Sequence, residues 1–160
     1  MNAVDMLLAH HRRMEDLLGR LVEASGDEKR RLFEETADML VAHITIEEQH
    51  FYPAVKARRT EDVLLESLEE HLSLKRILAD LVQLSPQDDR FDPKLHVLKE
   101  QAEHHHEEEE EHLFPKARKL LDTEALDALG AEMAATMREI AQKNPRCGVL
   151  GQTDEAAPLP

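Results

Sequence analysis

The sequence contains no tryptophan, one cysteine and only five glycines, and aromatic residues make up 3% of its 160 residues. β-Sheet proteins are enriched in aromatic and β-branched residues, so this composition argues against a β-rich fold. Leu, Ala, Glu and Arg, which favour helices, are abundant instead. The composition therefore predicts an all-α protein, and the length is sufficient for one domain with a core of its own.

Other features that the sequence lacks limit where the protein can be located and what it can bind. Cys147 is the only cysteine, so no intrachain disulfide can form, and a reducing cytoplasm is the expected location. No segment resembles a signal peptide, and no long uncharged apolar run could span a membrane. The net charge of −14 argues against binding to nucleic acid, whose phosphates would repel the protein. The sequence does not indicate a protein partner.

Cap residues, prolines and hydrophobic periodicity divide the chain into five expected helices. These helices cover about residues 2–25, 27–59, 60–84, 92–120 and 123–144, with Asn2, Thr60, Asp92 and Thr123 as expected caps. Pro53 and Pro115 should kink or end the second and fourth helices. Residues 1–144 are thus expected to form the domain. Residues 145–160 lack periodicity and are expected to form a mobile C-terminal tail.

One phrase occurs twice in the sequence. The pattern His-x-x-x-Glu-Glu-x-His-apolar-aromatic-Pro begins at His43 and begins again 62 residues later, at His105. A His and a Glu four residues apart lie on one face of a helix, separated by about 40° around its axis. Two such pairs, ending at Glu47 and Glu109, can face each other across a bundle. This arrangement is typical of a dinuclear metal site.

The repeat also includes the helices that precede these phrases. An offset of 60 residues aligns the apolar stripe of residues 4–18 with that of residues 64–78, and it aligns His11 with His71. This repeat predicts that the chain contains two copies of one helical hairpin. We expect an up-down four-helix bundle with pseudo-twofold symmetry and an additional C-terminal helix packed on its outside.

The inward-facing residues of this bundle predict a metal centre. A carboxylate buried among apolar side chains costs several kcal/mol unless a cation compensates its charge. The predicted ligands are His11, His43, Glu47, His71, His105 and Glu109. Mixed His and carboxylate ligands without cysteine favour iron, with manganese or zinc as less favoured alternatives.

Three further residues are candidate additional ligands. His50 and His112 lie three residues beyond the glutamates and can either face the site or be polar residues at the bundle end. Tyr52 can bind as a phenolate, or it can be a rim aromatic with its hydroxyl in water. Solvent is the expected environment of His10, His104 and His106. Glu48 and Glu110 are expected beside the ligands rather than on the metal.

The ligand pattern resembles the hemerythrin-like (HHE cation-binding) family over residues 3–143. The residues that carry the resemblance are His11, His43-x-x-x-Glu47, His71 and His105-x-x-x-Glu109, together with the Phe-Tyr-Pro and Leu-Phe-Pro phrases. The resemblance implies two iron ions bridged by the two carboxylates and an oxo or hydroxo group. It also implies O₂, peroxide or NO as ligand. The N-terminal segment with His10-His11 is similar to a mycobacterial-type subgroup, for which catalase-like peroxide decomposition is implied.

A coordination count favours peroxide chemistry over oxygen transport. Two octahedral irons have about twelve positions, and the six protein ligands plus one oxo bridge leave one position open on each iron. Oxygen-carrying hemerythrins use five histidines, whereas Lys75 occupies the position one turn after His71 here. Two adjacent open positions would suit peroxide.

Other functions are compatible with the same ligands. An O₂, NO or iron sensor, or an iron store, would bind without turnover, although sensors of this family usually carry an effector domain. An iron–sulfur repair protein of this fold would carry a Cys-rich N-terminal segment. A structural zinc bundle would be colourless.

Overall fold

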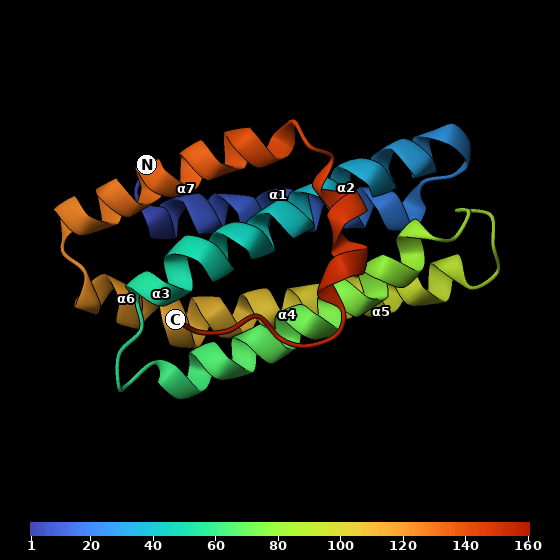
Figure 1. Cartoon of the computed structure of the whole chain (residues 1–160). Coiled ribbons are helices and arrows are strands. Elements are labelled where there is room, and N and C mark those ends of the chain that lie inside the picture. Colours follow the sequence, from blue (N-terminus) through green and yellow to red (C-terminus); the bar gives the residue numbers. More distant parts are fainter.

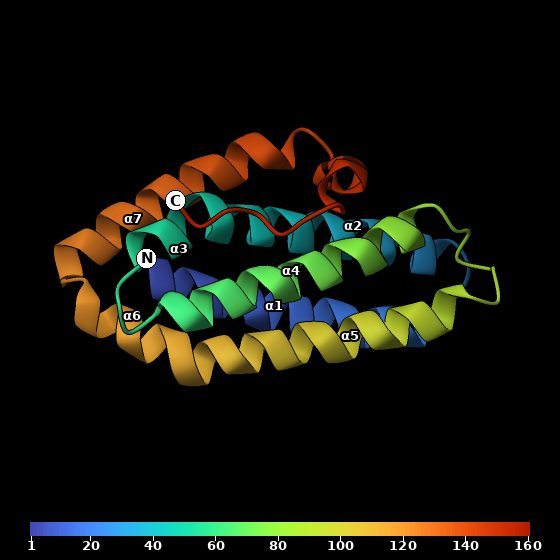
Figure 2. The same ribbon diagram turned by 60° about the horizontal axis from the view of Figure 1, so that its bottom comes forward.

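Four long helices form an antiparallel bundle in the structure, a computed structural model that describes residues 1–160. They are α1 (Ala3–Glu23), α2 (Gly26–Ile46), α4 (Glu61–Val82) and α5 (Phe91–Glu108). Figures 1 and 2 show that they run alternately up and down, with their connections at the two ends of the bundle. The predicted all-α, up-down four-helix bundle is therefore confirmed.

Each of α2 and α5 ends in a π-helical turn. The turn η1 (Glu47–Phe51) leads into α3 (Tyr52–Ala54), and the turn η2 (Glu109–Leu113) leads into α6 (Phe114–Leu120). A proline stands at the second position after each turn, and a proline ring would clash with a carbonyl of a regular α-helix. The wider π turn changes the spacing between the ring and that carbonyl, so the clash is avoided. Both prolines therefore mark interruptions, as predicted, but the second helix ends at Ala54 rather than near residue 59.

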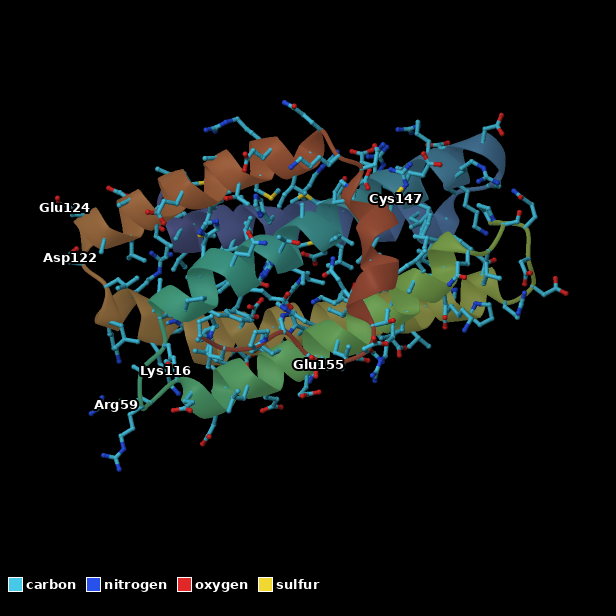
Figure 3. All side chains as sticks on the ribbon, viewed as in Figure 1. Arg59, Lys116, Asp122, Glu124, Cys147 and Glu155 are labelled. Atoms are coloured by element: carbon cyan, nitrogen blue, oxygen red, sulfur yellow. The ribbon has the colours of Figure 1, made fainter.

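The helix caps agree with the prediction only in part. The side chain of Asn2 accepts a hydrogen bond from the N–H of Asp5, as a cap does. The last long helix is capped by Asp122, one residue before the expected Thr123, and Figure 3 marks Asp122 at its start. Thr60 holds the N-cap position of α4 as expected, but its side chain makes no capping bond, because its hydroxyl donates to the carbonyl of Val55 instead.

The start of α5 also differs from the prediction. This helix begins at Phe91, and its N-cap position is held by Arg90, which makes no side-chain capping bond. The expected cap, Asp92, pairs instead with Lys29 across the bundle at 2.6 Å. Phe91 is fully buried, so the packing of its ring, rather than a local cap, fixes where the helix begins.

The interior consists of two apolar clusters separated by a polar layer. One cluster fills the end near the α1–α2 connection, and the other fills the end near the chain N-terminus. Along α1 the change from one cluster to the other falls between Leu7 and Met14, and along α4 it falls between Leu68 and Leu74. His11 and His71 lie in these gaps. No helix has an apolar stretch long enough to cross a lipid bilayer.

The additional helix α7 (Thr123–Ala141) packs against α1 and α2 on the outside of the bundle (Figure 1). Its residues Leu126, Leu129 and Met133 are buried and complete the apolar cluster at that end. At Gly130 the chain's first residues approach so closely that a Cβ would lie 2.6 Å from the carbonyl oxygen of Met1. A side chain there would push α7 away from α1, so glycine permits this packing.

The C-terminal residues have a packed position, which differs from the expected mobile tail. Residues Pro145–Gln152 form the 3₁₀ helix η3, which crosses α2 and α4, and the remaining residues run along α4 (Figures 1 and 3). Val149 is fully buried in an apolar cluster, and Arg146 pairs with Asp38 at 2.6 Å. Arg76 donates to two carbonyls of the last segment. A single apolar side chain gives no periodicity, so the sequence pattern does not reveal this segment.

Candidate metal centre

The polar layer between the two apolar clusters consists of buried side chains from every helix of the bundle. Its members are His11 from α1, His43 from α2, Glu47 from η1, Tyr52 from α3, His71 from α4, His105 and His106 from α5, and Glu109 from η2. All six predicted ligands are therefore brought together in one place. Each of the two π turns begins at one of the glutamates, which agrees with the frequent occurrence of π turns at functional sites.

Three histidines form one end of the layer, which we call the three-histidine group: His11, His43 and His106. One potential ligand atom of each lies within 4.8 Å of the other two. The rings of His11 and His106 stack, with centroids 3.9 Å apart. Such close imidazoles are suited to sharing one cation.

The opposite end contains His71, His105 and Tyr52, and we call the first two the two-histidine group. Their Nε2 atoms are 3.1 Å apart. The hydroxyl of Tyr52 lies 3.2 Å from His71 Nε2 and donates a hydrogen bond of 2.8 Å to Glu109. Its ring stacks on that of His71. This end therefore places a phenol beside its two imidazoles.

The two glutamates lie between these groups and reach both. Glu47 Oε1 is 3.3 Å from His43 Nε2 and 3.2 Å from His71 Nε2. Glu109 Oε1 is 3.3 Å from His11 Nε2 and 3.4 Å from His105 Nε2. Each carboxylate thus contacts one histidine of each group, as a carboxylate that bridges two metal ions would.

Several atoms of the layer are buried without a hydrogen-bond partner. They are Nε2 of His11, His43 and His106, Oε2 of Glu47 and Oε1 of Glu109. A buried polar atom without a partner costs about 1–3 kcal/mol, and natural proteins contain few of them. Here all of them belong to one layer, so one missing component explains them together. A cation would satisfy both the imidazole nitrogens and the carboxylate oxygens.

The outer nitrogens of four histidines are held by neighbouring side chains. His11 Nδ1 lies 2.8 Å from Glu110, His71 Nδ1 lies 2.9 Å from Glu48, and His105 Nδ1 lies 2.7 Å from Glu70. His43 Nδ1 lies 3.2 Å from Nδ1 of His10. These contacts orient each ring so that Nε2 faces the interior, as is usual for metal-binding histidines.

Two of the outer carboxylates are themselves held by cations. Lys75, which is almost fully buried, donates to Glu48 at 2.9 Å, and Arg12 donates to Glu110. Burial opposes ionisation of Glu48, but its contacts with His71 and Lys75 hold its pKa below the usual range. Lys75 therefore supports His71 through Glu48 rather than standing in the ligand set.

The two buried glutamates titrate differently. Burial and the charge of Glu47 raise the pKa of Glu109 to about 7. Burial would also raise the pKa of Glu47, but nearby His43 and hydrogen bonds within the layer hold it well below its usual range. Of the histidines, His105 has a pKa raised well above the usual value, because Glu109 and other carboxylates outweigh its burial. Without a cation, protons on Glu109 and His105 therefore offset the negative charge of the carboxylates in the layer.

His106 is the residue whose expected solvent position is wrong, because it is buried within the three-histidine group. The repeat contained the signal that places it. With the offset of 62 residues, His106 aligns with Ile44, which is a buried core residue. His10 is also partly buried against His43, whereas His104 is exposed as expected.

The structure places the three candidate additional ligands in different environments. Tyr52 is fully buried, so the expectation of a rim aromatic with its hydroxyl in water is wrong. His50 instead hydrogen-bonds Thr136 of α7 at 2.7 Å, outside the layer. His112 is 56% exposed and pairs with glutamates on the surface. The π turn rotates these two histidines away from the layer that a regular helix would have brought them toward.

The layer is twofold in its pattern but differs at two positions. Tyr52 aligns with Phe114, and both rings stack on the first-helix histidine of one hairpin, His71 and His11 respectively. Only Tyr52 carries a hydroxyl, and only the second hairpin has a histidine, His106, at the position of Ile44. The two ends of the layer are therefore chemically unequal.

The chain is similar in sequence to known proteins over most of its length. The chain is 29% identical over 143 residues to the uncharacterized protein Rv2633c of Mycobacterium tuberculosis, covering 88% of each chain. It is 26% identical over 144 residues to a protein of Nostoc named DNA nickase, but it spans only 41% of that relative's length.

A solved structure and a family model give the assignment. The crystal structure of a hemerythrin HHE cation binding domain-containing protein from Mycobacterium kansasii, an Rv2633c homolog, superposes with a TM-score of 0.80 at 25% identity, covering 89% of each chain. The model of the hemerythrin HHE cation binding domain matches residues 2–117, which include every predicted ligand. The chain therefore belongs to the hemerythrin HHE cation binding domain family.

Proposed function

We propose that the polar layer holds two iron ions and that the protein binds O₂, peroxide or NO there, with catalase-like decomposition of peroxide as its activity. The observation that carries this proposal is the set of buried, unpartnered nitrogen and oxygen atoms that share one layer. Histidine and carboxylate without thiolate suits iron, although manganese and zinc accept the same atoms. The net charge of −14 opposes nucleic acid binding, so we propose no nucleic acid partner.

The two iron ions would have unequal protein ligands. The three-histidine group with both carboxylates would hold one ion, and the two-histidine group with the same carboxylates would hold the other. His106 would thus raise the expected count of four histidines to five, because it would fill a position that the sequence predicts to be open. An external ligand is then expected beside the two-histidine group, where fewer protein atoms are available.

Tyr52 is the residue best placed to act on such a ligand. Its hydroxyl lies in contact with both His71 and Glu109. Burial and the nearby carboxylates raise the pKa of Tyr52 well above its usual value, so the free phenol keeps its proton. The hydroxyl could donate a hydrogen bond or a proton to an external ligand beside the two-histidine group, or Tyr52 could itself bind as a phenolate if a metal compensated its charge. Two irons, if bound, would supply the two-electron exchange that peroxide disproportionation requires.

The test combines metal analysis with the response to hydrogen peroxide. We expect about two irons per chain, near-ultraviolet absorption, and sustained oxygen release that falls at least tenfold in Tyr52→Phe. A Phe side chain keeps the stacking on His71, so the variant removes only the hydroxyl. His112→Ala, on the surface, is the matched control and should behave as the wild type.

Other results would change the function or the metal. Two irons with a spectral change on adding peroxide, but without oxygen release, would replace the catalase-like activity with sensing or iron storage. One zinc ion, or no metal, would contradict the di-iron centre.

A further inference from the structure

A groove on the bundle surface leads to the three-histidine group. It has a volume of about 370 Å³ and lies between α1 on one side and α5 with its π turn η2 on the other. His11 and His106 line it, and both are more than nine-tenths buried with an Nε2 atom that has no hydrogen-bond partner. The groove is therefore a surface opening bounded by two residues whose buried Nε2 atoms belong to the layer.

The walls of this groove are acidic, and we call it the acidic groove. Its carboxylates are those of Glu15, Glu103, Glu107, Glu110 and Glu111. Against them stands one positive side chain, Arg12, and one apolar side chain, Leu18. A concave surface lined by one sign of charge concentrates ions of the opposite sign and accelerates their association. The local charge therefore favours a cation and disfavours an anion.

Arg12 closes part of this opening. Its guanidinium donates to both oxygens of Glu110, at 2.6 and 2.5 Å, and to Glu15 at 3.2 Å. Glu110 in turn contacts His11 Nδ1. The side chain of Arg12 is 60% exposed, so it can leave these contacts at little cost. The positive charge of Arg12 thus occupies the carboxylate contacts that an arriving cation would make.

We propose that the acidic groove is the route by which a divalent metal cation enters the layer, arriving first at the three-histidine group. This inference rests on the proposed metal centre and adds the path by which it is filled. The exposed carboxylates attract the hydrated cation, Arg12 moves aside, and the unpartnered imidazole nitrogens of the layer receive the cation. The groove carboxylates affect the rate of loading and not the number of ions finally held.

The experiment measures the loading rate of Co²⁺ into the metal-free full-length chain by stopped-flow absorption. One variant replaces the exposed groove residues Glu15, Glu103, Glu107 and Glu111 with Gln. A matched control replaces four exposed glutamates elsewhere, Glu66, Glu69, Glu132 and Glu139, with Gln. Both variants lose the same net charge, so only the position of the charge differs.

We expect the groove variant to load about tenfold more slowly at low ionic strength, and the control to change less than twofold. The difference should shrink at high salt, because salt screens exposed charges. The amount of cobalt bound at equilibrium should be the same in all three proteins. Equal rates in the two variants would overturn the groove as the route. If the wild type bound no cobalt, the metal centre itself would be overturned.

A single substitution should change the loading rate in the opposite direction, by making it faster. Arg12→Gln removes the positive charge from the groove and should accelerate loading about threefold. Arg13→Gln removes a neighbouring positive charge that pairs outside the groove, with Asp16 and Glu35, and should leave the rate nearly unchanged. Slower or unchanged loading in Arg12→Gln would contradict the part assigned to Arg12.

Discussion

At the residue scale, the polar layer depends on side chains that support the histidines as much as on the histidines themselves. Glu48 contacts His71, and Glu110 contacts His11, at equivalent positions of the two hairpins. Their cationic partners are not equivalent, because Lys75 is buried whereas Arg12 is exposed. The contacts that support His71 are thus shielded from water. Their loss should lower the free energy of unfolding more than loss of the contacts that support His11.

Replacing Lys75 with Met should lower the free energy of unfolding by about 3 kcal/mol, because it leaves Glu48, whose side chain is only 10% exposed, without its cation. Chemical denaturation of the metal-free protein measures this change. Lys94→Met removes an exposed partner of Asp80 and should cost less than about 1 kcal/mol. Adding Glu48→Gln to Lys75→Met should recover part of the loss. Equal effects of the two lysine variants would contradict the role of the buried pair.

Tyr52 can be observed directly, because it is the only tyrosine and the chain has no tryptophan. Burial and the charges of Glu109 and Glu47 raise its pKa well above the usual value of about 10. Absorption at the phenolate wavelength should therefore not rise near pH 10 while the metal-free protein is folded. An ordinary titration of the folded protein near pH 10 would place the hydroxyl in water.

The same shift affects stability in alkaline solution. In the folded protein Tyr52 stays neutral, whereas in the unfolded chain it ionises at its usual pKa of about 10. Its contribution to stability is therefore complete below pH 10 and is lost as the pH rises above that value. Tyr52→Phe should remove this dependence, so the two proteins should differ in how their melting temperatures fall above pH 10.

At the element scale, the chain repeats a helical hairpin whose second helix carries a π turn. The sequence predicts the hairpins because their apolar stripes and histidines recur at a fixed offset. It does not predict the π turns, since a single wider turn leaves no periodic signal. That turn decides the positions of His50 and His112, which a regular helix would have directed toward the layer.

The C-terminal segment is an element that periodicity missed, and its removal makes a specific prediction. A chain ending at Asn144 loses the burial of Val149 and the pair between Arg146 and Asp38. We expect its free energy of unfolding to fall by about 2 kcal/mol, while its helical content stays nearly the same. Val149→Ala in the full chain should account for about half of this loss. An unchanged melting temperature would support the mobile tail expected from the sequence.

At the scale of the whole molecule, the bundle is an approximate twofold object with a polar layer at its middle. The repeat was enough to predict this symmetry and six members of the layer. The departures from symmetry were harder to predict, because they depend on single residues. His106 is adjacent to a predicted ligand and lies within a run of polar residues, and only its alignment with Ile44 indicates that it is buried. The burial of Tyr52 depends on where the π turn directs it.

Charge balance in the layer predicts that metal binding displaces protons. Near pH 6 the metal-free layer holds protons on Glu109, whose pKa burial and Glu47 raise to about 7. It also holds them on His105 and His71, whose pKa values nearby carboxylates raise despite burial. Metal affinity should therefore rise between pH 6 and pH 8, with protons released on binding. Calorimetry in buffers of different ionisation enthalpy measures this release, and an affinity independent of pH would contradict it.

The most direct test of the proposed dinuclear centre, with its two unequal ends, is the Mössbauer spectrum of the protein loaded with iron-57. We predict two iron environments in equal amounts, one for the three-histidine group and one for the two-histidine group. The variant His106→Ile, which restores the residue type of Ile44, should make the two environments more alike. A wild-type spectrum with a single iron environment, or a chain that retains one iron or none, would contradict the account.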